Sequence, residues 1–224
     1  MTGREKLIAA SRGGEVESKP SLAWFNSAKP GLLADGWILA SASQINQARE
    51  TAGDACLLVA VKSPFGWAKE EGLDLMSALH ANPVSGDEEL SRLRDKTRME
   101  IRHALDQGAD GICYILAGAE PTQTTPMQYG GFLLELDREI LQEFSGAVFN
   151  AVWVQGDKEL YLEFVADLPC HALGWDCQAT GIHTNAIRPY REGAFFGDSP
   201  ESDIALLNQP PVSHLFAASQ EASC

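Results

Sequence analysis

Short apolar runs that alternate with longer polar or amphipathic segments dominate the pattern of this sequence. Eight such runs lie within residues 21–25, 36–42, 55–61, 111–117, 147–154, 171–176, 193–197 and 213–218. Most are nearly continuous in apolar character, which is typical of strands buried on both faces of a parallel sheet. Helical patterns lie between them, so the sequence predicts strands and helices in alternation.

This alternation predicts an α/β fold, a compact (β/α)8 TIM barrel formed as a single domain by residues 1–224. Such barrels usually need about 250 residues and at least ~200, so the chain is close to the lower limit. The connection at residues 198–211 is short for a crossover between parallel strands. We therefore expect an incomplete or irregular eighth strand. An open doubly wound sheet is the alternative.

Terminal residues indicate where the helices begin and end. Thr2 and Glu5 match a capping box, and Ser43 can cap a second helix. Helices are predicted over residues 2–14, 43–53, 87–108, 125–146, 157–167 and 200–209, the fourth with a break at Gly130 and Gly131.

The composition restricts the class of protein. A net charge of −14 argues against a general nucleic-acid-binding protein, because phosphate contacts need clustered lysines and arginines. No stretch reaches the ~18–20 apolar residues of a membrane span, and the first residues lack the apolar region of a secretory signal. Five cysteines without a tight spacing pattern indicate reduced thiols. We expect a cytoplasmic protein that binds a small molecule, with no membrane or nucleic-acid partner.

The stretch LPCHALGWDCQATGIH, residues 168–183, holds two cysteines and two histidines and so resembles a metal site. Cys170 and His171 are adjacent, so on a strand their side chains point to opposite faces. His171 and Cys177 share a face but lie ~20 Å apart along a strand. They cannot meet at one tetrahedral ion without a sharp turn of the chain. The sequence therefore predicts a strand here and no metal.

Several segments, in order along the chain, resemble the uroporphyrinogen decarboxylase superfamily. They are REKLIAASRGGEVESKPSLAW, VKSPFGWAKEEGLDLMSALHANP, ALDQGADGICYILAGA, ALGWDCQATGI and AFFGDSPESDIALL, which run from Arg4 to Leu207. The superfamily is built on a barrel. It includes the haem-pathway decarboxylase, which needs no cofactor, and zinc-dependent methyltransferases that act on corrinoid proteins or coenzyme thiols. The resemblance also implies a homodimer.

The residues that carry out catalysis in this superfamily are not matched. The decarboxylase has an Arg-rich segment after its first strand, where this chain has only Lys29 as a basic residue within 24–36. The methyltransferases hold zinc through a His-x-Cys pair on the fifth strand, where this chain has Trp153 and Gln155. We therefore expect no cofactor.

Polar residues near the carboxyl ends of the predicted strands form the candidate site, since these ends converge at the mouth of a barrel. We predict catalytic roles for Lys62, Tyr114 and Asp176, and substrate-binding roles for Asn26, Gln155 and Asp198. Structural alternatives exist for the first three residues: Lys62 can pair with a neighbour, Tyr114 can fill the core, and Asp176 can cap a helix.

The leading functional hypothesis is a carboxy-lyase-type enzyme that acts on an organic acid or a tetrapyrrole-like ligand at the barrel mouth. Within the superfamily, the alternative is a role like that of the corrinoid or coenzyme methyltransferases. The alternative from another class is a barrel that binds a ligand or partner without catalysis, because the arginine segment and the metal motif are missing.

Overall fold

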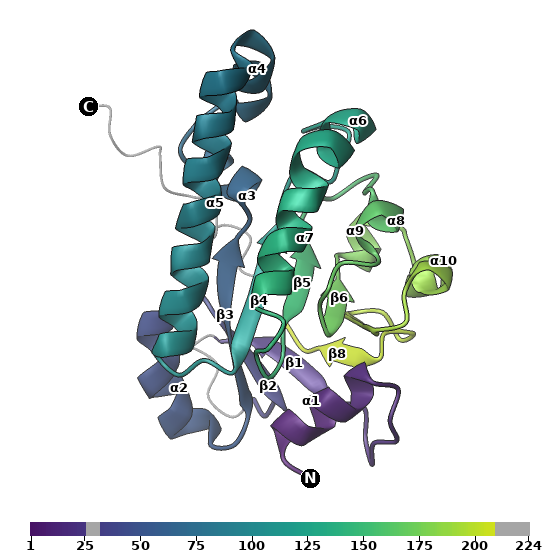
Figure 1. Cartoon of the computed structure of the whole chain (residues 1–224). Coiled ribbons are helices and arrows are strands. Elements are labelled where there is room, and N and C mark those ends of the chain that lie inside the picture. The colour runs from purple at the N-terminus through teal and green to yellow at the C-terminus, as the bar shows by residue number, and fades with distance from the viewer. Residues whose placement is uncertain (26–31, 209–224) are drawn as a thin grey trace, which may run out of the picture.

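The structure is a computed structural model that describes residues 1–25 and 32–208 (Figure 1). Eight parallel strands pair in chain order and close into a barrel, which confirms the predicted (β/α)8 fold. The strands are β1 Ser21–Trp24, β2 Gly36–Leu39, β3 Cys56–Lys62, β4 Gly111–Leu116, β5 Ala151–Val154, β6 Ala172–Gly174, β7 Ala194–Gly197 and β8 Ile204–Leu206.

Helices surround the barrel, and those that follow α7 have only one short turn each. They are α1 Gly3–Ser11, η1 Ala42–Gln44, α2 Ile45–Ala52, α3 Pro64–Glu70, α4 Leu75–Ala81, α5 Pro83–Asp106, α6 Pro126–Gln128, η2 Tyr129–Leu133, α7 Leu134–Glu143, α8 Leu162–Val165, α9 Cys177–Thr180, α10 Thr184–Ile187 and η3 Arg188–Tyr190. In Figure 1 the long α5 runs beside β3 and β4, and its upper part extends with α4 above the strands. Among the described residues, no helix combines the length and apolar character that a membrane span needs.

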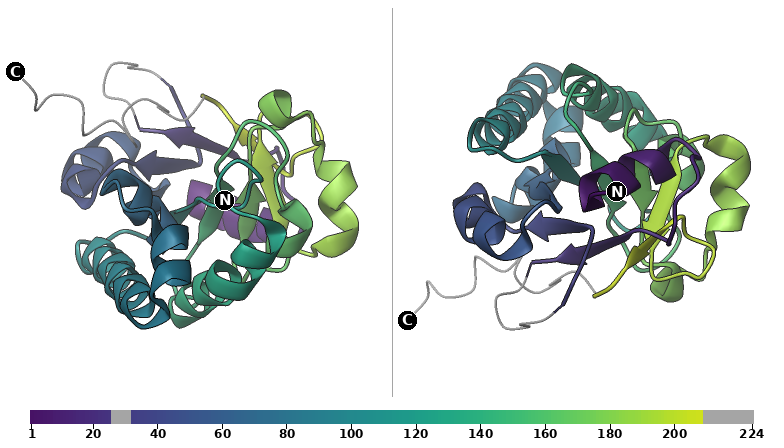
Figure 2. Two further views of the ribbon diagram at one scale, coloured as in Figure 1. Left: turned by 90° about the horizontal axis from the view of Figure 1, so that it is seen from above. Right: turned by 90° about the horizontal axis from the view of Figure 1, so that it is seen from below.

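Alternate residues of each strand point into the barrel or toward the helices, as the pleat of a strand requires. The inner cluster includes Leu22, Trp24, Ile38, Cys56, Leu58, Cys113, Ile115, Ala151, Trp153, Ala172, Ala194, Phe196, Ile204 and Leu206. Helix α1 adds Leu7 to this cluster and closes the amino-terminal end of the barrel, as Figure 2 shows from below. The residues of opposite parity form a larger outer core with the helices.

The eighth strand is where the sequence prediction was wrong. β8 comes from residues 204–206, within the segment that we predicted as a helix over 200–209, and it pairs with both β7 and β1. The run at 213–218 that we predicted as a strand lies outside the described residues. β8 is short, as expected, and its burial pattern alternates. A strand of three residues is too brief for its pattern to be told from one turn of a helix.

Two of the predicted helices are confirmed at their most distinctive residues. The capping box of α1 is present, with Glu5 N–H donating to Thr2 Oγ1 at 3.2 Å and Thr2 N–H donating to Glu5 at 2.8 Å. The expected break at Gly130 and Gly131 is a π-helical turn, η2, between α6 and α7. The helix predicted over 157–167 is only the four-residue α8.

Gly111 at the start of β4 has no room for a side chain. A Cβ atom there would lie 1.9 Å from the backbone oxygen of Phe149 and 2.7 Å from its carbonyl carbon. We expect Gly111→Ala to lower the free energy of unfolding by about 3 kcal/mol, because backbone atoms of the barrel must move apart. Urea unfolding measures this. Gly146→Ala is the control, since a Cβ atom there would have no described atom within 4 Å apart from its chain neighbours. Equal losses of stability in the two variants would contradict the prediction.

Candidate functional site

The carboxyl ends of the strands form one rim, which Figure 2 shows from above. Four of the six predicted site residues lie on this rim. Lys62 ends β3, Gln155 and Asp198 directly follow β5 and β7, and Asp176 lies two residues after β6. Asn26 lies outside the described residues. The structure therefore brings most of the predicted set to one end of the barrel, although the side chains do not all act in the same way.

Tyr114 is the predicted site residue that does not reach the rim. It lies in the middle of β4 with its side chain in the outer core, fully buried. Its hydroxyl donates to the carboxylate of Asp137 on α7 at 2.6 Å, and the hydroxyl of Tyr129 donates to the same carboxylate at 3.4 Å. Since Cys113 and Ile115 point inward, the pleat of β4 forces Tyr114 outward. Burial and the nearby Asp137 raise the pKa of Tyr114 well above its ordinary value.

Lys62 ends β3 and is held at the rim by α3. Its ammonium forms an ion pair with Glu70 and lies 4.8 Å from the ring centre of Trp67. The Lys62 side chain is only 14% exposed. Thr97 Oγ1 on α5 also donates to the Lys62 carbonyl at 3.1 Å. The backbone and the ammonium of this residue are therefore fixed by two different helices.

A cavity of about 260 Å³ opens beside this part of β3, and we call it the β3 cavity. It is lined by Ala40, Ser41, Ala42, Val59, Ala60, Val61, Lys62, Trp67, Glu100 and Ile115. It exists because β2 pairs with β3 only as far as Val59, whereas β3 continues to Lys62 along β4. The unequal lengths of the two neighbouring strands leave an open edge at the rim.

Trp67 gives the β3 cavity its most distinctive group. The indole Nε1–H is buried and finds no hydrogen-bond acceptor among the described residues. The ammonium of Lys96 lies 3.8 Å from the centre of the same ring, on the side of α5. A buried donor without an acceptor costs about 1–3 kcal/mol of stability. A ligand whose oxygen atom accepts from this N–H would remove that cost and bind more tightly. Sequence reasoning missed Trp67, although it lies five residues after Lys62 in the first turns of the following helix.

Asp176 acts as a helix cap, which was the structural alternative for this residue. Its Oδ1 accepts from the N–H of Ala179 at 2.8 Å and so begins α9. Burial, followed by the carboxylates of Asp198 and Asp176, raises the pKa of the Cys177 thiol to about 12. Cys177 therefore stays protonated near neutral pH and is neither a good nucleophile nor a good metal ligand.

The rim after β4 and β5 holds a buried carboxylate that sequence reasoning also missed. Glu120 is 5% exposed and accepts a hydrogen bond from the amide of Gln123. Gly156 lies against it: φ is +147°, and a Cβ atom there would be 2.6 Å from Glu120 Oε2. The Oε1 atom of Gln155 is buried, and no described residue donates a hydrogen bond to it. Burial lowers the pKa of Lys69 on α3, and Glu120 acts in the opposite direction.

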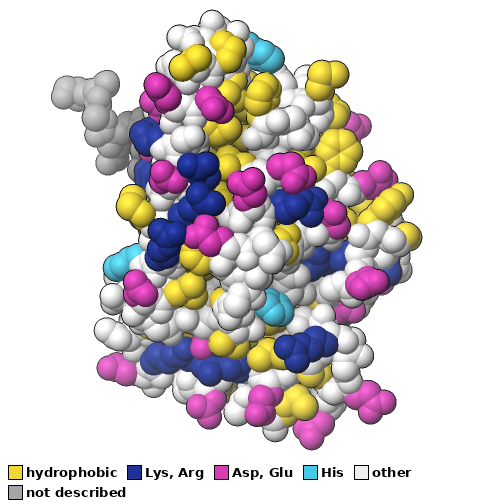
Figure 3. Space-filling view, in the orientation of Figure 1, with side chains coloured by type: hydrophobic (Ala, Val, Ile, Leu, Met, Phe, Trp, Pro, Cys, Tyr) yellow, Lys and Arg dark blue, Asp and Glu magenta, His cyan; other side chains and the backbone are white. Residues whose placement is uncertain are grey.

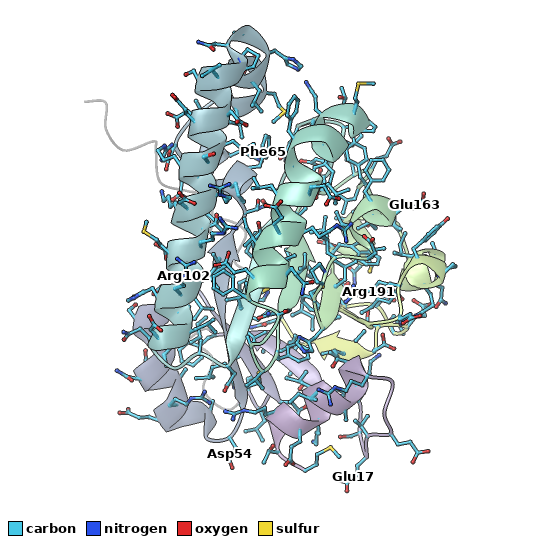
Figure 4. The ribbon with its side chains drawn as sticks, viewed as in Figure 1. Glu17, Asp54, Phe65, Arg102, Glu163 and Arg191 are labelled. Atoms are coloured by element: carbon cyan, nitrogen blue, oxygen red, sulfur yellow. The ribbon has the colours of Figure 1, made fainter. Side chains whose placement is uncertain are left out.

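The cysteines and histidines of residues 168–183 do not come together. Cys170 and His171 precede β6, whereas Cys177 follows it at the opposite end. Asn150 N–H donates to His171 Nδ1 at 2.9 Å, and Arg191 Nη2 donates to Cys170 Sγ at 3.3 Å. Figure 4 shows Arg191 beside β6, away from the rim above it. Within residues 1–25 and 32–208, no group of three or more His, Cys, Asp or Glu side chains could hold a metal.

The residues of β5 do not suit a zinc ion, which the methyltransferases of the uroporphyrinogen decarboxylase superfamily hold on their fifth strand. Trp153 on β5 points into the barrel and packs 5.6 Å from Phe196, and Gln155 follows as a neutral amide. Neither side chain provides the imidazole or thiolate that zinc prefers. We therefore derive no step that depends on zinc at β5.

The fold and the rim define a small (β/α)8 barrel whose candidate site lies at the carboxyl ends of its strands. No family model and no curated protein sequence matches the chain. Among solved structures, it is similar to a methyltransferase from Methanosarcina mazei, with a TM-score of 0.59 and 14% sequence identity. The match covers 74% of this chain and 56% of that one, so the chain spans little more than half of the methyltransferase. This likeness shows the shared fold.

Proposed function

We propose that this protein binds a small organic acid or carbonyl compound in the β3 cavity, as a methyltransferase-like enzyme of the uroporphyrinogen decarboxylase superfamily. The observation that carries the proposal is the lining of this cavity by Lys62 and by Trp67, whose buried indole N–H has no acceptor within residues 1–25 and 32–208. A carboxylate or carbonyl oxygen supplies that acceptor and is attracted by the nearby ammonium. The volume of about 260 Å³ suits a small metabolite better than a tetrapyrrole.

Methyl transfer is the leading reaction because a solved structure with this fold is a methyltransferase. Decarboxylation of a small organic acid is the second candidate, and Lys62 favours it because this cation lines the cavity. Decarboxylation of a polycarboxylate is disfavoured, since the carboxylates of Glu120, Asp176 and Asp198 lie around the same rim and repel further negative charge.

A binding titration followed by a turnover assay tests the proposal. The probes are small carboxylates and their amide analogues, and binding is followed by calorimetry. We expect Lys62→Met to weaken carboxylate binding about tenfold or more, since a charge-assisted contact contributes ~1.5–3 kcal/mol. The matched control is Lys6→Met, a lysine on α1 that pairs with Asp35 at the other end of the barrel. Equal binding by both variants would contradict the proposal.

Mass spectrometry then separates the reactions. The assay contains an added methyl donor or, in a second arm, a thiol that can accept a methyl group. A methyl group gained by the ligand from the donor, or lost from it to the thiol, supports methyl transfer, whereas loss of carbon dioxide supports the carboxy-lyase. Binding that depends on Lys62, without either product, identifies a barrel that binds without catalysis and rejects the enzymatic part of the proposal.

A further inference from the structure

A large groove lies on the outside of the molecule and shares no lining residue with the β3 cavity. Its volume is about 940 Å³, and it runs between the α4–α5 hairpin and the π-turn η2. Leu79, Pro83, Val84 and Phe132 form its apolar lining. Figure 3 shows apolar side chains gathered at the end of the molecule where α4 and α6 lie. We call this feature the hairpin groove.

The apolar residues of the hairpin groove are unusually accessible. Val84 is 71% exposed and Phe132 is 37% exposed, whereas Leu79 behind them is buried. The groove has a defined end, because His80 packs edge-on against Phe132 and hydrogen-bonds the amide of Gln128 at 3.0 Å. These contacts tie the hairpin to α6 and η2 and give the groove fixed walls.

The walls of the groove carry negative charge. Asp87 and Glu88 on α5 line it and are exposed. Asp95 also lines it, but its carboxylate pairs with Arg94 at 3.2 Å and Arg98 at 3.8 Å. Arg92 also lines it, but its guanidinium is bound to Glu71 at 2.6 Å and Glu89 at 2.8 Å. The groove therefore combines an apolar floor with acidic walls, in a chain whose net charge is −14.

We propose that the hairpin groove binds a basic amphipathic helix of another protein. An apolar groove between helices is a common receptor for the apolar face of a helix. The acidic walls favour lysines or arginines on the flanks of that helix. A second copy of this chain is disfavoured as the occupant, because it would bring the same excess of negative charge to an already acidic surface.

Fluorescence anisotropy with synthetic peptides tests the proposal on the full chain. The probe is a labelled peptide of about 18 residues, five helical turns, with leucines on one face and lysines on the other. A peptide of the same composition, scrambled to remove the apolar face, shows how much binding comes from charge alone. We expect the amphipathic peptide to bind at least about tenfold more tightly than the scrambled one.

Two matched pairs of variants locate the binding. The first pair consists of two double variants that change the net charge equally. The groove variant, Asp87→Lys with Glu88→Lys, should weaken binding of the amphipathic peptide about tenfold more than the control variant, Glu15→Lys with Glu17→Lys. Figure 4 places Glu17 at the end of the molecule opposite α4. Val84→Ser should weaken binding about fivefold, and Met99→Ser, exposed on the same helix but outside the groove, should not.

Three results would overturn this proposal. One is equal binding of the amphipathic and scrambled peptides. Another is an equal loss of peptide affinity in the groove variant and its matched control, in either of the two pairs. The third is a dimer, seen by light scattering, that Val84→Ser dissociates, since the groove would then bind a second copy. Circular dichroism confirms that each variant is folded.

Discussion

Arg191→Met is expected to lower the free energy of unfolding by ~3–5 kcal/mol, one of the two largest effects in the molecule. Arg191 is 7% exposed, and its guanidinium donates to the carbonyls of Ala166, Cys170 and Ala194 at 2.8, 2.7 and 3.2 Å. The substitution keeps an apolar stem but leaves these carbonyls without donors. Urea denaturation followed by circular dichroism measures the loss.

Arg138→Met is the control for this experiment. Arg138 also bonds a carbonyl and pairs with Asp167 at 3.0 Å, but its side chain is 30% exposed and water can replace its contacts. We expect a loss below about 1 kcal/mol for this partly exposed pair. If Arg191→Met and Arg138→Met lower the free energy of unfolding to within about 1 kcal/mol of each other, Arg191 does not hold the loop before β6.

The second large effect is a pH dependence that originates at Asp137. This carboxyl is 2% exposed, and burial raises its pKa from 3.8 to about 7, against the opposing effect of the hydrogen bonds from Tyr114 and Tyr129. The folded state therefore binds the proton more tightly than the unfolded chain. The resulting stability is fully present below pH 3.8 and is lost as the pH rises to about 7, by a total of ~4 kcal/mol.

Asp137→Asn removes the titrating group and keeps a side chain of the same shape that accepts a hydrogen bond. We expect the variant to lack this fall in stability between pH 4 and pH 7 and to be more stable than the parent chain at pH 8. Chemical denaturation at a series of pH values gives both curves. If the free energies of unfolding of the parent chain and the variant change with pH in parallel, the pH dependence comes from groups other than Asp137.

Much of the barrel could be predicted because its strands obey a simple physical pattern. The runs that became β3, β4 and β5 are apolar on both faces, since one face meets the barrel interior and the other meets helices. The capping box at Thr2 depends only on neighbouring residues, so it too could be read from the sequence. β8 could not, because its three residues are defined by pairing with β1 and β7 rather than by a local pattern.

The candidate site was predictable only in part. Lys62 was expected at the rim because it ends a clear strand, and the structure places it there. Tyr114 was misplaced because the site prediction used the order of residues and not the direction in which each side chain points. The orphaned N–H of Trp67 depends on how α3 packs against α5, and the burial of Glu120 depends on Gly156, which is distant in sequence. Neither relation is visible in one sequence.

The most direct test of the central claim, that the β3 cavity is the ligand site, is nuclear magnetic resonance of the indole N–H groups. The chain has five tryptophans, so their ¹⁵N-labelled indole signals can be assigned with single Trp→Phe variants. We predict that small carboxylates and carbonyl compounds shift the signal of Trp67 first, and that Lys62→Met raises the carboxylate concentration needed for this shift about tenfold or more. Ligands that leave Trp67 unchanged and shift Trp175, whose N–H donates to Ile182 in the outer layer, would contradict the account.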